Sequence, residues 1–140
     1  MTSNTTILTA FNTQFFEFID DVEKIVPNDK SIIQCKQILT LAKKGNPKLL
    51  ISYWFNYMTV PYFNQITSGD ITFFIEKNYK DDLGNVNKNN NKDNNENDKF
   101  VKEIDRLREP VRKMDDNNKS ICMKYIQNMT KLSQMYFKNK

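Results

Sequence analysis

Histidine is absent from the 140 residues of this chain, which removes the side chain that most often acts as a base near neutral pH. The two cysteines, Cys35 and Cys122, stand far apart and form no CxxC pair, so the spacing of a zinc site is missing. Both fall on apolar helical faces, which indicates buried, reduced thiols. No glycine-rich phosphate loop, HExxH motif or DxD motif occurs. We therefore expect a protein that is not an enzyme and that binds no metal or cofactor.

Four carboxylates lie close together in the sequence near the N-terminus. Residues three or four positions apart on a helix share a face, and clustered carboxylates there could in principle hold a cation. These residues lie mostly away from the apolar stripe of their helix, so a solvated acidic face is the preferred interpretation. The four are Glu17, Asp20, Asp21 and Glu23.

The distribution of charge is the physical feature that points to a partner. The chain has a net charge of +4, and residues 99–140 alone carry eleven Lys/Arg against five Asp/Glu. Residues 1–83 and 84–98 are each close to neutral, at −1. A basic helical block could contact nucleic-acid phosphates or an acidic protein surface. The candidate contacts are Lys102, Arg106, Arg108, Arg112, Lys113, Lys119 and Lys124.

Acidic residues interrupt this basic block. Their spacing predicts ion pairs between Glu103 and Arg106 and between Asp105 and Arg108. The sequence has no RRM, KH, zinc-finger or helix-turn-helix signature. A non-enzymatic protein–protein interaction module is therefore the leading hypothesis, and a nucleic-acid-associated factor that uses the same basic helices is the alternative.

Apolar residues recur at intervals of three and four along most of the chain, which predicts helices. Proline is expected to end the first helix at Pro27, to break the third near Thr59, before Pro61, and to kink or break the fifth after Arg108. A strand over residues 71–75 competes with the fourth helix. The predicted helices cover residues 7–26, 30–44, 47–59, 71–79, 100–114 and 119–137.

Aromatic residues concentrate between residues 46 and 83, which hold nine of the seventeen in the chain. The helical spacing places Tyr53, Trp54 and Tyr57 in the core. Three other aromatic residues fall outside the apolar stripes and form the candidate partner surface, because large aromatic side chains away from a core face are typical of interfaces. They are Phe55, Tyr62 and Phe73.

Residues 84–98 differ from the rest of the chain in composition. Eight of the fifteen are asparagine and Val86 alone is apolar, so nothing offsets the entropy lost on ordering the backbone. We expect a long disordered loop between a helical block at residues 6–83 and a basic helical block at residues 99–138. The fold class predicted is all-α: a single domain over residues 1–140, folded as a compact bundle of five to six helices.

Nothing in the sequence suggests a membrane protein. No apolar run reaches the roughly 18–20 residues that span a bilayer, and the N-terminus lacks the basic region and cleavage site of a signal peptide. We expect a soluble, intracellular protein.

Three blocks of the sequence resemble a family of small proteins of nucleocytoplasmic large DNA viruses, the giant viruses of the mimivirus and chlorella-virus types. They are FNTQFFEFIDDVEKIVPNDKSI, AKKGNPKLLISYWFNYMTVPYFNQITSGDITFFIEKNYKDDL and NNKSICMKYIQNMTKLSQMY. The resemblance covers nearly the whole chain except residues 84–98. It implies a viral protein that is found in the virion or in the viral factory of the host cytoplasm and whose partners are other viral proteins. It identifies no functional residue.

Overall fold

Every element in the described part of the chain is a helix, which confirms the all-α fold class. The computed structural model describes residues 3–76 and 94–138, with side chains described from residue 99 onward in the second range. The elements are α1 (Asn4–Ile25), α2 (Lys30–Gly45), α3 (Leu49–Trp54), the π-helix η1 (Phe55–Thr59), α4 (Val60–Thr67), α5 (Thr72–Glu76), α7 (Asn94–Arg112) and α8 (Asp116–Lys138).

The Asn-rich segment is only partly inside these ranges. Residues 84–93 lie outside the described residues, so the loop expected there stays a prediction. Helix α7 begins at Asn94, and the last five residues of the segment predicted as loop are therefore helical.

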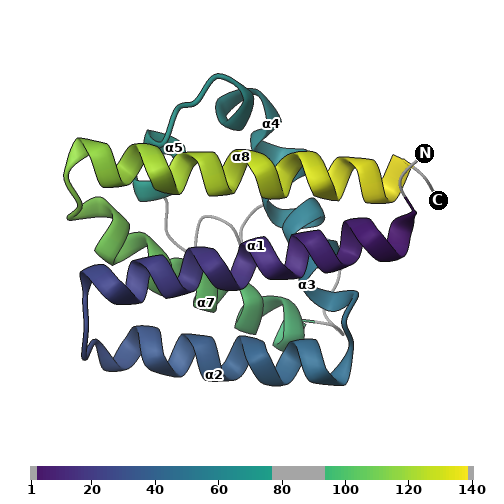
Figure 1. The fold of residues 1–140 in the computed structure, drawn as a ribbon, viewed down its shortest axis with the longest axis horizontal. Helices are drawn as coiled ribbons and strands as arrows, with labels where there is room; N and C mark the ends of the chain where they lie inside the picture. Colours follow the sequence, from purple (N-terminus) through teal and green to yellow (C-terminus); the bar gives the residue numbers. More distant parts are fainter. Residues whose placement is uncertain (1–2, 77–93, 139–140) are drawn as a thin grey trace.

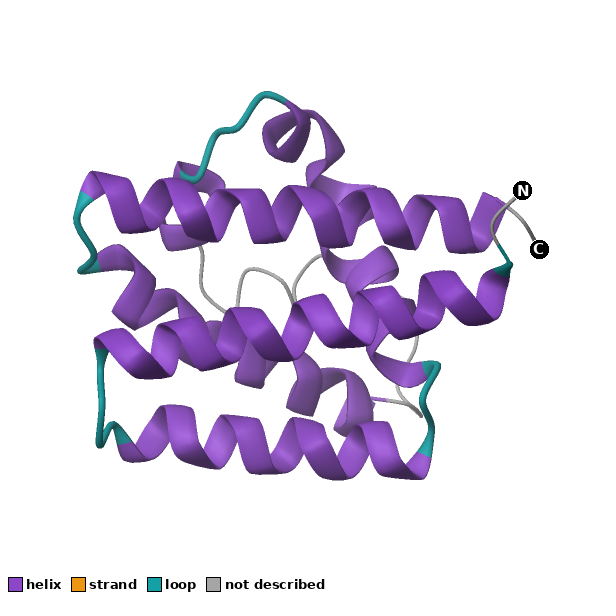
Figure 2. Ribbon diagram, in the orientation of Figure 1, coloured by secondary structure: helices purple, strands orange, loops and turns teal. Residues whose placement is uncertain are grey.

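Helix α1 is the centre of the bundle. It packs against α8 on one side and α2 on the other, with α3 and α7 behind it (Figure 1). Short loops join α1 to α2 and α2 to α3 (Figure 2), and Pro27 follows the end of α1 as expected. The Asp29 side chain begins α2 by accepting hydrogen bonds from the N–H groups of Ser31 and Ile32.

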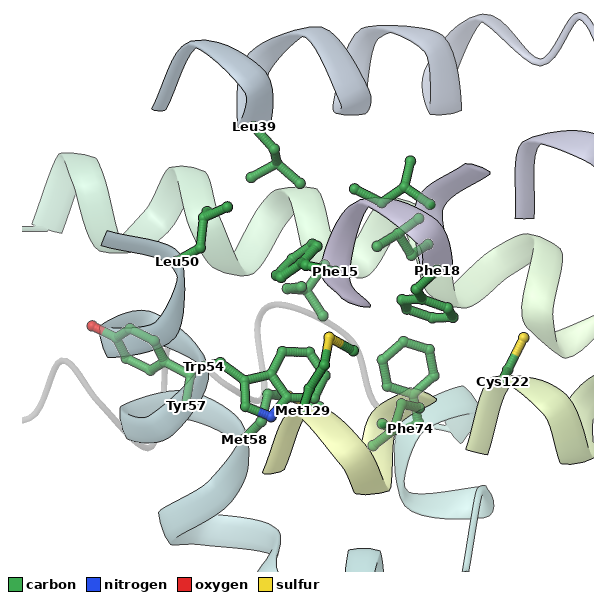
Figure 3. Packing of buried hydrophobic residues seen from close by; sticks show 14 of the residues in the cluster. Phe15, Phe18, Leu39, Leu50, Trp54, Tyr57, Met58, Phe74, Cys122 and Met129 are labelled. Atoms are coloured by element: carbon green, nitrogen blue, oxygen red, sulfur yellow. The ribbon is translucent and has the colours of Figure 1, made fainter. Parts of the chain in front are cut away.

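The core joins α1 to α3 and α8 through aromatic rings. Phe11 and Phe15 of α1 meet the Trp54 ring edge to face, with centroids 6.3 and 6.0 Å away. Figure 3 shows Phe15, Trp54 and Met129 converging in this region, and all three are buried. The prediction that Trp54 and Tyr57 belong to the core is confirmed, whereas Tyr53 is only partly buried beside the Phe100 ring.

The break expected near Thr59 takes a different form. The chain widens into η1, in which the N–H of Val60 bonds to the carbonyl of Phe55, five residues back. Pro61 then lies in the first turn of α4, and the non-helical residue is Tyr62 (φ −124°, ψ 22°). Proline lacks an N–H and crowds the carbonyl four residues before it, so a wide turn followed by a kink accommodates it without ending the helical path.

Two further expectations can be compared with the structure. Residues 72–76 form α5, so the helix rather than the competing strand is correct. Of the kink or break expected after Arg108, the break is wrong, because α7 continues through Pro110 to Arg112. Pro110 stands two residues before the helix end, where the loss of one hydrogen bond affects only the last turn.

Candidate functional site

Two of the three predicted surface aromatics are in the core. Tyr62 is 5% exposed and Phe73 is 6% exposed, and their rings pack together with centroids 5.2 Å apart. The prediction that they form a partner surface is therefore wrong. It considered only the apolar stripe within each predicted helix, whereas the wide turn of η1 and the kink at Tyr62 change the direction of the residues that follow, and Phe73 of α5 packs on the Tyr62 ring.

The third, Phe55, lies at the surface of η1. Its half-buried ring stacks on Phe137 of α8, with centroids 4.5 Å apart. These rings border a surface depression of about 640 Å³, here called the α8 depression. Its lining residues are Phe55, Lys131, Gln134, Met135, Phe137 and Lys138.

Buried hydroxyl groups of α8 hold the end of α3 and η1 against α8 and thereby position Phe55. The Trp54 Nε1–H donates to Thr130 Oγ1 over 3.1 Å. The Thr59 and Ser133 hydroxyls share a hydrogen bond of 2.7 Å. These groups are buried, and the bonds satisfy the polar atoms that the contact between the two helices removes from water.

The arginines of α7 are mostly engaged within the protein. Arg108 is only 1% exposed, with its guanidinium 3.5 Å from the Asp105 carboxylate and 5.4 Å from the centre of the Phe74 ring. The prediction that Arg108 contacts phosphates or an acidic partner is wrong, because Arg108 is buried and Phe74 of α5 covers it. Arg106 Nε lies 3.4 Å from a Glu103 oxygen, so both expected ion pairs are confirmed.

Basic residues at the end of α7 also pair with a carboxylate, here at the protein surface. Arg112 pairs with the Glu109 carboxylate, and its Nε donates to the carbonyl of Ile75 over 2.8 Å. Lys113 lies 3.6 Å from Glu109. Lys102 is exposed. Most of the basic residues predicted on α7 therefore have an acidic partner on the same helix.

The lysines of α8 differ. Among the residues that the structure describes, none of the four has a carboxylate oxygen within 4.0 Å. Lys119 is half-buried beside a second surface hollow that Lys124 also lines, and the others are exposed. The four are Lys119, Lys124, Lys131 and Lys138.

Sequence reasoning therefore identified only part of the α8 site. It proposed Phe55, Lys119 and Lys124 but left Lys131 and Lys138 out of the candidate contacts. The signal that could have found them is their spacing, because Lys124, Lys131 and Lys138 are seven residues apart and so share one helix face. The contact of Phe55 with α8 had no sequence signal.

The two cysteine thiols and the Glu103 carboxylate are buried. Burial raises the pKa of the Cys35 thiol to about 12 and that of Cys122 to about 11, and both thiols are free, as expected. Burial also raises the pKa of Glu103, while the Arg106 charge opposes that shift.

The acidic face of α1 is also engaged. Asp20 and Glu23 lie 2.6 and 3.8 Å from the ammonium of Lys36, and Asp21 accepts a 2.6 Å hydrogen bond from the Tyr125 hydroxyl. Among the side chains described, those of residues 3–76 and 99–138, no group of three or more Cys, Asp or Glu is arranged to hold a metal ion. None of the described helices has both the length and the apolar character needed to cross a bilayer.

Comparison with known proteins yields no relative. No protein-family model, no curated protein and no solved structure matches this chain.

Proposed function

We propose that this chain is a non-enzymatic protein-interaction module that binds its partner along α8. The observation that carries the proposal is the α8 depression, where Phe55, Met135 and Phe137 lie beside Lys131 and Lys138. Aromatic residues and methionine are enriched at the centres of protein interfaces, and charged groups at the rim steer the partner and fix its orientation.

The state of the reactive groups supports a binding role. Cys35 and Cys122 are buried with raised thiol pKa values, so the thiolate that acts as a nucleophile is scarce at neutral pH. The hydrogen bond to Asp21 raises the pKa of the Tyr125 hydroxyl, which therefore keeps its proton. These groups stabilise the bundle.

The sequence resemblance suggests the biological setting. A module related to proteins of large DNA viruses would bind another viral protein, in the virion or in the viral factory of the host cytoplasm. This part of the proposal depends on the resemblance alone.

A second candidate, nucleic-acid binding, is favoured by the lysines of α8 that lack carboxylate partners. If all four contacted phosphates of duplex DNA, the logarithm of the binding constant would fall with the logarithm of salt concentration with a slope of about −3.6. A salt titration with non-specific DNA measures this slope directly. Absent or salt-independent binding would exclude this candidate.

Site-specific photo-crosslinking tests the interaction module. A photoreactive amino acid replaces Met135 in the α8 depression or, as the control, the exposed Leu41 of α2. Helices α2 and α8 lie on opposite sides of α1 (Figure 1). The proposal expects one defined protein crosslinked from the cells that make the chain through position 135 and not through position 41.

Purified partner then allows a quantitative test. Met135→Asp should weaken its binding by about tenfold or more, since a charge placed in an apolar contact opposes desolvation. Leu41→Asp introduces the same charge on another exposed apolar position and should leave binding unchanged. Equal effects of the two variants would contradict the proposed site.

A further inference from the structure

The outward face of α8 indicates which kind of partner fits it, an inference that rests on the proposed function. We infer that the partner docks as an acidic amphipathic helix lying along α8. Its apolar side chains contact Ile121 and Met135, and its carboxylates, repeated every seven residues, pair with Lys124, Lys131 and Lys138.

Two parallel rows of exposed residues define this face. The first consists of Ile121, Asn128 and Met135, and the second consists of the three lysines, each three positions after a member of the first row. Ile121 is 41% and Met135 42% exposed. Seven residues are about two helical turns, so each row extends about 21 Å along α8. The face therefore combines a mixed apolar and amide row with a row of positive charge.

The seven-residue period favours a helical partner. A helix that crosses another at about 20° meets it every seven residues, which is the geometry of coiled coils. An extended strand repeats every two residues, about 6.8 Å, and would not keep step with these rows. The 23 residues of α8 give such a partner a long surface.

Charge selects an acidic partner. Asp116, in the first turn, is the single carboxylate of α8, so a helix that supplies carboxylates gains ion pairs that this chain does not make. Pairs formed in an interface that excludes water are stronger than the same pairs at an open surface.

A second copy of this chain fits less well. Two α8 helices would bring lysines together. Three of the four carboxylates on the acidic face of α1 already have partners, because Asp20 and Glu23 hold Lys36 and Asp21 accepts from Tyr125. Nucleic acid fits less well too, since phosphates gain nothing from Ile121 and Met135.

The test uses the full chain and a synthetic helical peptide of about three heptads, with Leu and Glu in two rows that match α8. A peptide of the same composition, rearranged so that the Glu residues leave their common face, is the control. Fluorescence anisotropy at low salt should show the patterned peptide binding at least about tenfold more tightly than the rearranged one.

Charge reversal provides the specific readout. Lys124→Glu, Lys131→Glu and Lys138→Glu combined should weaken binding of the patterned peptide about tenfold and should favour a peptide with Lys in place of Glu. The matched control reverses three exposed lysines elsewhere, Lys30 and Lys44 of α2 and Lys48 before α3, and should not change peptide binding. Far-UV circular dichroism checks that the variants remain folded.

Four results would overturn the inference. They are equal binding of the two peptides, no effect of the triple reversal, tighter binding of duplex DNA of equal charge, and a dimer of the chain that the triple variant abolishes. The proposed function has its own failing result, which is equal weakening of partner binding by Met135→Asp and Leu41→Asp. If Met135→Asp prevents binding of the crosslinked partner but the triple variant binds it normally, the interaction module stands and the acidic helix does not.

Discussion

Helix α7 contains five basic and five acidic residues, whereas α8 contains four lysines and a single aspartate. In α7 the arginines pair with carboxylates three residues before them, and Arg108 does so inside the core. In α8 the buried polar residues are hydroxyls, Thr130 and Ser133, and the lysines face outward. Of the net charge of +6 on residues 99–140, α8 carries +3, from four lysines and one aspartate, and these lysines have no carboxylate partner among the described residues.

Packing explains the difference. Helix α7 contacts α1, α2, α5 and α8, so some of its charged side chains lose water and need partners. Helix α8 contacts α1, α3, η1, α4 and α7 but keeps one face exposed, where a lysine stays hydrated without a partner. The net charge of a segment therefore does not say where the charge is available.

Substitution of Arg108 is expected to reduce the stability of the protein most. Arg108→Ala should lower the free energy of unfolding by about 3 kcal/mol, because it leaves a cavity and removes the partner of Asp105 and of the Phe74 ring. Arg108→Met keeps much of the packing volume and should lose less. Urea denaturation measures both. A loss below about 0.5 kcal/mol for the alanine variant would show that this charge is not structural.

The hydroxyls of α8 should come next. Thr130→Val removes the acceptor of the Trp54 N–H and should reduce stability by about 1–3 kcal/mol. Thr9→Val is the matched control. The hydroxyls of both threonines donate to the carbonyl four residues before them, but Thr9 is exposed on α1. Thermal unfolding should separate the two variants. Equal shifts in Tm would mean that the hydrogen bond between Trp54 of α3 and Thr130 of α8 contributes nothing.

The buried carboxylate of Glu103 in α7 should make the stability of the protein depend on pH. Because burial raises the pKa of Glu103 above its ordinary value of 4.5, the folded state binds this proton more readily than the unfolded state. The contribution of Glu103 to stability is therefore present below pH 4.5 and is lost as pH rises through the folded-state pKa. Unfolding of the wild type and of Glu103→Gln between pH 4 and 7 measures it. The wild type should lose stability relative to the variant as pH rises, and a constant difference would contradict this.

The smallest effect on stability is expected for the α8 lysines. Reversing Lys124 or Lys131 should change the free energy of unfolding by less than about 0.5 kcal/mol each, as is usual for exposed residues away from caps and cores, and reversing Lys138, in the last turn of α8, by up to about 1 kcal/mol because it opposes the helix dipole. Urea denaturation is again the measurement. A large loss from any one would reveal an internal role and remove the contrast between the two helices.

Local features of the sequence predicted a good part of the fold. The apolar spacing gave α1, α2 and α8 within a few residues of their ends, because it depends on the helical repeat within one segment. The pairs Glu103–Arg106 and Asp105–Arg108 were predictable for the same reason. The candidate site was harder, because the neighbours of each side chain belong to other helices.

The sequence by itself determined that the chain is helical, where most helices begin and end, and that α8 repeats lysine every seven residues. The tertiary structure alone decided that Tyr62, Phe73 and Arg108 are buried and that Phe55 meets Phe137. Helix periodicity and ion pairs at short spacing depend on backbone geometry within a few residues. Burial depends on which helices pack together, and here α5 brings Phe73 onto Tyr62 and Phe74 onto Arg108.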